Sequence, residues 1–454
     1  MNGTRASRTR TTAGTCVLLL LFGLPLALHA ETTLLRGGRI FTVTQGTLEK
    51  GDLLIVGERI AAVGPSIEAP PGARIIDVSG KSVYPGLVEA YNHLGLVEIW
   101  AVEATVDIDE HSDPITPQVS VVDAIHPDSA LIPVGRITGV TSALCAPAAG
   151  NVMAGMSALI HLDGDRVSKM VIHAPTALHI TLGEPARGRY PDRYPMTRMG
   201  VAALLRETFT KAVEYREKLE RYARERKAWE AEEKGEKDPS SPPETAAEEA
   251  KRQEPEKPAR DLQLEALLPV LSGKIPVVAT ANRLGDIETA LRLADTFGFR
   301  LVLHGATDGY KIAEELAARD IPVIVHPILT QPSSMETLGV IYENAARLAE
   351  AGVRIALHTK SPHNVRNLPF EVGRTVAFGL PWEKALEAVT INPATIFGVA
   401  DEIGSIEPGK YADIVVVDGD IFQPLSRTEH LFIAGREISF ENHDTRLLER
   451  YRAP

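Results

Sequence analysis

Residues 83–95 read Val83-Tyr84-Pro85-Gly86-Leu87-Val88-Glu89-Ala90-Tyr91-Asn92-His93-Leu94-Gly95, and this segment is the most informative about the fold. It stands where the sequence pattern changes. Before it, residues 33–78 alternate short apolar runs with glycine-containing turns, which predicts a small β-module. After it, residues 84–400 alternate apolar runs with amphipathic stretches, which predicts strands and helices that follow one another.

The second half of this α/β region gives the clearest strand signals. Amphipathic helices are expected at residues 285–297 and 309–319. Strand–helix repetition at this spacing predicts a parallel sheet, and the length of the region favours a (β/α)8 barrel. Four short apolar runs are expected to be buried parallel strands: residues 275–279, 300–303, 321–325 and 353–357.

A second β-rich stretch lies near the C-terminus. Residues 414–417 are strongly apolar and β-branched, and residues 431–438 have the pattern of an edge hairpin. We therefore expect a small flanking β-sandwich domain built from residues 31–83 and 401–454. The barrel would occupy residues 84–400 between these two parts.

Residues 206–262 break the strand–helix rhythm. Residues 206–233 repeat charged side chains at helical spacing, and residues 234–258 are rich in Pro, Glu, Lys, Ser and Ala. We interpret this segment as a charged helix that leads into a linker, inserted within one barrel repeat. Surface decoration is the simple interpretation, and a lid or docking arm is the alternative.

Residues 1–30 resemble a secretory signal peptide. A basic start with Arg5, Arg8 and Arg10 precedes the apolar run 17–28, and the small residue Ala30 suits cleavage. The sequence predicts an exported protein, periplasmic or extracellular, with no membrane span after cleavage. An uncleaved anchor is the alternative.

Charge and cysteine content limit the partners and the sources of stability. The net charge of −12 disfavours nucleic acid as a partner. After cleavage only Cys145 remains, so no internal disulfide can form. Stability must come from the apolar core.

Several stretches resemble the amidohydrolase superfamily, and its imidazolonepropionase-like members in particular. Residues 83–95 resemble the first barrel strand, on which members carry an Asp and then a His-x-His pair. The likeness continues, in the family's order, at residues 139–141, 302–305, 385–394 and 398–413. It implies a barrel enzyme that hydrolyses C–N bonds with a metal-activated water. The metal ligands would be histidines from several strand ends and an Asp from the last strand.

The sequence departs from this ligand pattern at four positions. Tyr91 replaces the first His of the pair, Thr280 and Asn282 replace histidines of a later strand, and Lys360 falls near the expected Asp. His93 and His304 are retained. The resemblance thus leaves His93 and His304 as residual metal ligands, with His326 as a further candidate. One weakly held divalent metal, zinc before others, is the cofactor that these residues imply.

Three functions are compatible with such a site. In the first, the chain is an active hydrolase of a cyclic amide, small amide or dipeptide, with a rebuilt metal site or with Lys360 as a metal-free base. Alternatively it is a catalytically inactive subunit, a pseudoenzyme that partners an intact paralogue or binds a small amide-like ligand. A structural envelope protein is the third. Homo-oligomers and heteromers both remain open.

Overall fold

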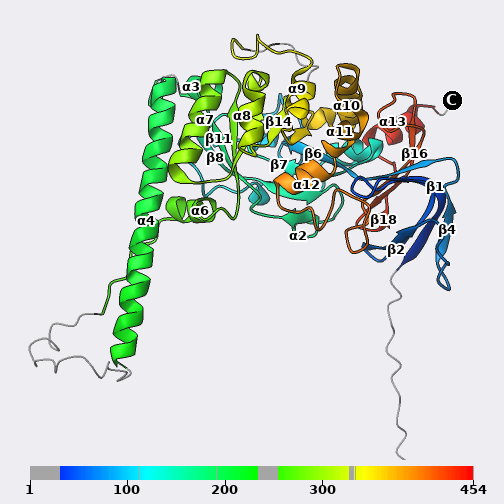
Figure 1. Cartoon of the computed structure of the whole chain (residues 1–454), viewed down its shortest axis with the longest axis horizontal. Coiled ribbons are helices and arrows are strands. Elements are labelled where there is room, and N and C mark those ends of the chain that lie inside the picture. The colour runs from blue at the N-terminus through cyan, green and yellow to red at the C-terminus, as the bar shows by residue number, and fades with distance from the viewer. Residues whose placement is uncertain are drawn as a thin grey trace, which may run out of the picture.

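The computed structural model describes residues 31–452, except residues 111, 191, 234–253, 327–331 and 333 (Figure 1). The predicted signal peptide and most of the predicted linker lie outside the described residues. None of the described helices is long and apolar enough to cross a membrane.

Strands from both ends of the chain form a single hydrogen-bonded sheet in the order β18-β17-β16-β5-β1-β2-β3, with β4 beside β1. The joint between the two ends is the antiparallel pair β5–β16, where Val83 lies opposite Val416. The strands contributed by the two ends are thus joined edge to edge in one hydrogen-bonded module, as expected for a β-domain built from both. Its strands are β1 Thr32–Phe41, β2 Thr47–Val56, β3 Arg59–Gly64, β4 Arg74–Asp77, β5 Ser82–Pro85, β16 Ile414–Asp418, β17 Arg427–Ile433 and β18 Arg436–Glu437.

Two further sheets make up the central region. One has the order β10-β9-β7-β6, with β6 parallel to β7, and the other has the order β15-β14-β13-β12-β11-β8, with β11 to β15 parallel. Short apolar runs form these strands because both of their faces are covered. Their bounds are β6 Leu87–Asn92, β7 Val140–Cys145, β8 Met153–Met156, β9 Ala158–His161, β10 Val171–His173, β11 Leu178–Thr181, β12 Val277–Ala281, β13 Leu301–Gly305, β14 Val323–Val325 and β15 Ile355–Leu357.

The two central sheets approach each other at a short backbone segment. Val88 of β6 donates its N–H to Val389 (2.8 Å), and Leu357 of β15 donates to Ala388 (3.0 Å). Alternate residues of both sheets also share one buried apolar cluster. The carboxyl ends of β6 and of β11 to β15 therefore open on a common site. Members of the cluster are Val88, Leu144, Leu159, Val278, Val302, Ile324 and Ala356.

Helices cover the outside of the central strands (Figure 1). The longest, α4, begins at Arg198, earlier than the charged pattern alone indicated. Its first half packs against α3, α6 and α7, and the charged remainder extends beyond the body of the protein. The helices are α1 Leu131–Gly135, α2 Val167–Met170, α3 Glu184–Arg189, α4 Arg198–Glu233, α6 Leu262–Leu271, α7 Leu284–Phe297, α8 Ala313–Ala318, α9 Asn344–Glu350, α10 Leu368–Ala377, α11 Trp382–Glu387, α12 Ile391–Ile396 and α13 His443–Arg452.

Candidate active site

Tyr91 occupies the centre of a group of histidines at the strand ends. Its ring stacks on the imidazole of His304, with centroids 3.9 Å apart and planes 21° apart. The rings of His93, His179 and His358 lie 5.5, 5.7 and 5.7 Å from it. The Tyr91 hydroxyl donates to the carbonyl of Pro147 (2.8 Å), and burial raises its pKa. A neutral phenol thus separates imidazoles that belong to four different strands or strand ends.

The two retained histidines are each fixed through one ring nitrogen. His93 Nδ1 lies 2.8 Å from the carbonyl oxygen of Ala146, and a carbonyl only accepts, so this nitrogen carries the proton. His304 Nδ1 lies 2.9 Å from Oγ1 of Thr280. Thr280, at a position where a histidine was expected, therefore orients His304.

Asn282 has a structural partner just beyond the end of β12. Its Oδ1 accepts from the hydroxyl of Thr307 (3.0 Å). The backbone of Gly305 lies so close that a Cβ there would be 2.5 Å from the same oxygen. Asn282 therefore holds the loop after β13, and its amide oxygen is already engaged.

Lys360 and His326 meet at the ends of β15 and β14. Lys360 Nζ lies 3.5 Å from His326 Nε2. The backbone of Lys360 has φ +67°, a left-handed conformation that L-residues rarely adopt. Burial lowers the pKa of the Lys360 ammonium, so a larger share of it is neutral than for a solvated lysine. The pair offers an amine and an imidazole side by side.

Glu89 connects β6 to the turn that carries Lys360. Its Oε1 accepts from the backbone N–H of Thr359 (2.7 Å), from the Thr359 hydroxyl (3.2 Å) and from Asn92 Nδ2 (3.3 Å). Its Oε2 is buried and has no partner among the described residues. Burial raises the pKa of Glu89 to about 8. Glu89 is therefore a protonated, positioning carboxyl at neutral pH.

Four histidines carry buried ring nitrogens without a hydrogen-bond partner in the described part of the chain, and His363 is one of them, through Nδ1. The other three belong to this site: Nε2 of His179, Nε2 of His304 and both nitrogens of His358. Burial is the main cause that lowers the pKa of each, to about 3 for His179, so all three imidazoles are neutral. Such nitrogens are free to bond a ligand that enters the site.

Sequence reasoning did not find His179. It lies within β11, between two apolar neighbours, and reads there as a core position. His358 lies close to His304, with ring centroids 4.9 Å apart. His363, nearby in the sequence, is hydrogen-bonded at Nε2 to the carbonyl of Glu98 (3.1 Å).

The donor set does not fit a catalytic metal. A catalytic zinc takes three protein ligands that converge on one point. Among the residues that the structure describes, no group of three or more His, Cys, Asp or Glu side chains is arranged to hold a metal ion. Tyr91 lies among the rings of the two expected ligands, His93 and His304, and the Lys360 charge opposes a cation nearby. These residues therefore do not support a metal-dependent step.

Comparison with known proteins identifies the family. The Amidohydrolase family model matches residues 293–441. An amidohydrolase from Thermotoga maritima MSB8, whose crystal structure is known, is 32% identical in sequence to this chain. The two structures superpose with a TM-score of 0.78, over 90% of this chain and 99% of the Thermotoga chain. The chain belongs to the amidohydrolase superfamily. The neighbouring structures of this superfamily imply a TIM-barrel catalytic domain with an N-terminal β-domain.

Two relatives show what share of a known protein's length this chain covers. Amidohydrolase TasK of Hapsidospora irregularis is 26% identical over 402 residues, which are 82% of this chain but 38% of TasK. The imidazolonepropionase of Symbiobacterium thermophilum is 24% identical over 419 residues, 79% of this chain and 81% of that enzyme. This amidohydrolase therefore spans 38% of TasK but most of the imidazolonepropionase. The family suggests a hydrolase that acts on C–N bonds.

Proposed function

We propose that this amidohydrolase hydrolyses the C–N bond of a small cyclic amide, small amide or dipeptide without a tightly held divalent metal. The observation that carries the proposal is the position of Tyr91, stacked on His304 in the middle of the histidine group. This ring takes the place of a first ligand and keeps the remaining imidazoles from converging. The eroded ligand set leaves Lys360 as the group that can move a proton.

The proposed step uses water and Lys360. The neutral amine of Lys360 accepts a proton as the water oxygen bonds to the carbonyl carbon of the substrate. The same proton then passes to the amide nitrogen as the C–N bond breaks, which yields a carboxylic acid and an amine. Burial favours the neutral amine of Lys360, and His326 Nε2 lies 3.5 Å from Nζ.

The buried histidines would serve the substrate carbonyl. In the tautomer in which Thr280 donates to His304 Nδ1, Nε2 of His304 carries a hydrogen that it can donate to the carbonyl oxygen. Nε2 of His179 is similarly without a partner among the described residues. Donors aimed at a developing oxyanion are among the largest contributors to acyl-transfer catalysis.

Location and assembly are part of the proposal. The basic and apolar pattern of residues 1–30 supports export to the periplasm or the extracellular space. Assembly with further copies, or with an intact paralogue that holds a metal, would suit a chain whose own ligand set is incomplete. In the second arrangement this chain would be a non-catalytic subunit.

Elemental analysis combined with turnover tests the proposal. Protein purified without added metal should contain well under one zinc, iron, nickel or manganese per chain, and chelation should leave its hydrolysis of a dipeptide and cyclic-amide panel unchanged. Lys360→Met should abolish turnover. Lys274→Met, at an exposed lysine before β12, is the matched control and should leave turnover unchanged.

Two results would overturn the proposal. A stoichiometric metal that is lost on changing His93 and His304 to Ala would establish the metal-dependent route. A metal-free protein that co-purifies with an intact paralogue and hydrolyses nothing alone would establish the non-catalytic subunit.

A further inference from the structure

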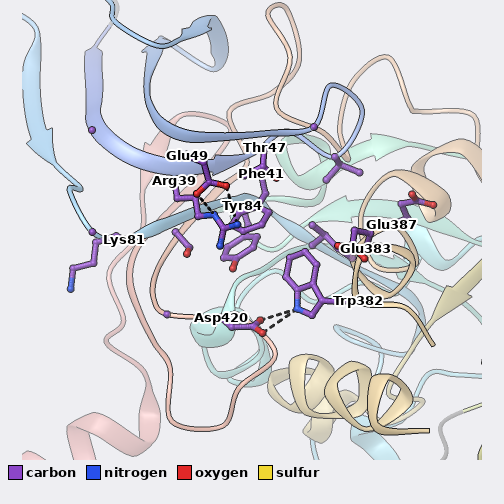
Figure 2. A pocket seen from close by; sticks show the side chains of 17 residues that line it. Arg39, Phe41, Thr47, Glu49, Lys81, Tyr84, Trp382, Glu383, Glu387 and Asp420 are labelled. Atoms are coloured by element: carbon purple, nitrogen blue, oxygen red, sulfur yellow. Dashed lines mark hydrogen bonds and ion pairs between the residues drawn. The ribbon is translucent and has the colours of Figure 1, made fainter. Parts of the chain in front are cut away.

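A cavity lies away from the strand-end site, between the β-sheet module and helix α11 (Figure 2). Its volume is about 820 Å³, within the range of small-molecule sites. Strands β1, β2 and β5 form one wall, and α11 with the turn after β16 forms the other. Neither Tyr91 nor any histidine of the candidate active site lines it.

Aromatic rings line one part of this cavity. Phe41 and Tyr84 stack with centroids 4.5 Å apart and planes 12° apart. Trp382 packs against both, with centroids 5.2 and 6.3 Å away. Phe41 and Tyr84 are buried, whereas Trp382 is half-buried and retains surface toward the cavity. An indole is the aromatic group that attracts a cation most strongly.

Carboxylates outnumber basic groups around the same cavity. Its lining includes four carboxylates against Arg39 and Lys81. Arg39 is paired with Glu49 (3.0 Å), and Lys81 with Asp418 (3.3 Å) and Glu429 (2.8 Å), neither of which lines the cavity. The local field is therefore negative. The four carboxylates are Glu49, Glu383, Glu387 and Asp420.

Glu383 and Asp420 form no ion pair with a described residue. Glu387, by contrast, is paired with Lys384 (2.8 Å). Asp420 is held in place by hydrogen bonds from Trp382 Nε1 (3.1 and 3.2 Å) and from the Phe422 N–H (2.9 Å). Figure 2 shows Asp420 directly beside the indole. A fixed carboxylate at the edge of the indole places a negative charge close to the aromatic ring, and the two together suit a cation.

We propose that this cavity binds a small organic cation, a quaternary or alkylated ammonium with an apolar body. The ammonium would lie against Trp382, with Asp420 and Glu383 supplying the opposite charge. The apolar body would extend into the cavity beside Trp382, because Arg39 already lies over the Phe41 ring, 4.9 Å from its centroid. The simpler view, that the rings only join the β-module to α11, predicts no such binding.

Isothermal titration of the full chain with choline and benzyltrimethylammonium tests the proposal, with 3,3-dimethylbutan-1-ol as the uncharged analogue of choline. We expect choline to bind at least tenfold more tightly than the alcohol, and benzyltrimethylammonium more tightly than choline. Higher salt should weaken binding of both cations, because the cavity is open to solvent.

Variants separate the site from the scaffold. Asp420→Asn, Glu383→Gln and Trp382→Leu should each weaken choline binding about tenfold, while Glu350→Gln, at an exposed carboxylate on α9, should not. Glu383 is exposed, so its variant tests the site even where Trp382→Leu disturbs folding. Equal binding of choline and the alcohol, no binding of either cation, or unchanged binding in Glu383→Gln and Asp420→Asn would each overturn the proposal.

Discussion

The Tyr91 ring lies parallel to the His304 imidazole at 3.9 Å, and this stack joins β6 to β13 across the centre of the candidate active site. The neutral phenol and the neutral imidazoles around it make the site polar but almost uncharged. Lys360 is the exception, since its amine can carry a charge. The chemistry of the site therefore differs from that of a cluster of carboxylates and histidines around a dication.

Removal of the Tyr91 hydroxyl should destabilise the protein without changing its shape. Tyr91→Phe leaves the buried carbonyl of Pro147 without its donor, and we expect a loss of about 1–3 kcal/mol in the free energy of unfolding. Tyr91→Ala, which also opens a cavity, should lose about 3–5 kcal/mol. Urea denaturation measures both. Tyr451→Phe, at an exposed tyrosine, is the control, and an equal loss there would contradict the prediction.

Removal of the Lys360 amine should lower kcat far more than it changes KM. General-base catalysis contributes roughly 10²–10⁴-fold, so Lys360→Ala should lose about that factor. Added methylamine should restore part of the rate, because it returns a base to the vacated space. Steady-state kinetics on the best substrate of the amide panel measures this. Full activity in Lys360→Ala would remove Lys360 from the mechanism.

Glu89 should make the stability depend on pH in one direction. Its pKa rises from 4.5 in a solvated carboxyl to about 8 in the folded protein, so between these values the folded state retains a proton that the unfolded chain has lost. The free energy of unfolding should therefore fall as pH rises from about 4.5 to 8, by up to roughly 1.4 kcal/mol per pH unit. Glu89→Gln should lack this slope.

The comparison with Glu89→Gln isolates this carboxyl, because the buried histidines titrate equally in both proteins. Denaturation curves at pH 5, 6.5 and 8 give the slopes. Parallel slopes for the two proteins would show that Glu89 is already ionised at pH 6.5, and its place as a protonated carboxyl beneath Thr359 would be wrong.

Asp413 should be the most sensitive carboxylate outside the site. It accepts from the Ala434 N–H (2.8 Å) and lies 3.1 Å from His161 Nε2, which ties the β16 side of the sheet module to β9. Burial opposes the charge on His161, but Asp413 outweighs it and raises the His161 pKa. Asp413→Ala should cost about 1–3 kcal/mol, because it removes the acceptor of the Ala434 N–H and the charged partner of His161.

The exposed Asp418→Ala is the control for Asp413→Ala and should change stability by less than about 0.5 kcal/mol. The raised His161 pKa also fixes the pH dependence. The contribution of the pair is complete below the unfolded-state pKa of His161, near 6.5, and declines as pH rises through the folded-state pKa. A loss in Asp413→Ala that is equally large at pH 6 and pH 9 would contradict this.

The fold could be predicted from the sequence where the pattern is local. The apolar run at residues 321–325 contains strand β14, Val323–Val325, which is fully buried. The two β-rich ends could be assigned to one module because each is too short to bury its own face. The start of α4 at Arg198 escaped prediction, because its first turns are buried against neighbouring helices and lack the charged pattern of the later turns.

The candidate site could be predicted only in part. His93 and His304 could be predicted because they stand at ligand positions of the superfamily resemblance. The stack of Tyr91 on His304 could not, because it depends on how β6 and β13 are placed relative to each other, which no local sequence signal encodes. His179 is hidden for a related reason, since one polar residue in an apolar strand resembles a satisfied core position. The left-handed turn at Lys360 is likewise set by the bond from Thr359 to Glu89, far away in sequence.

The β5–β16 pair has a consequence for how the chain is made. Residues 82–85 leave the ribosome long before residues 414–418, so the edge of β5 stays open until β16 has been made. A product that stops short would expose that edge and the apolar face beside it to proteases and to other nascent strands. The sheet can therefore close only on chains that have been translated past β16.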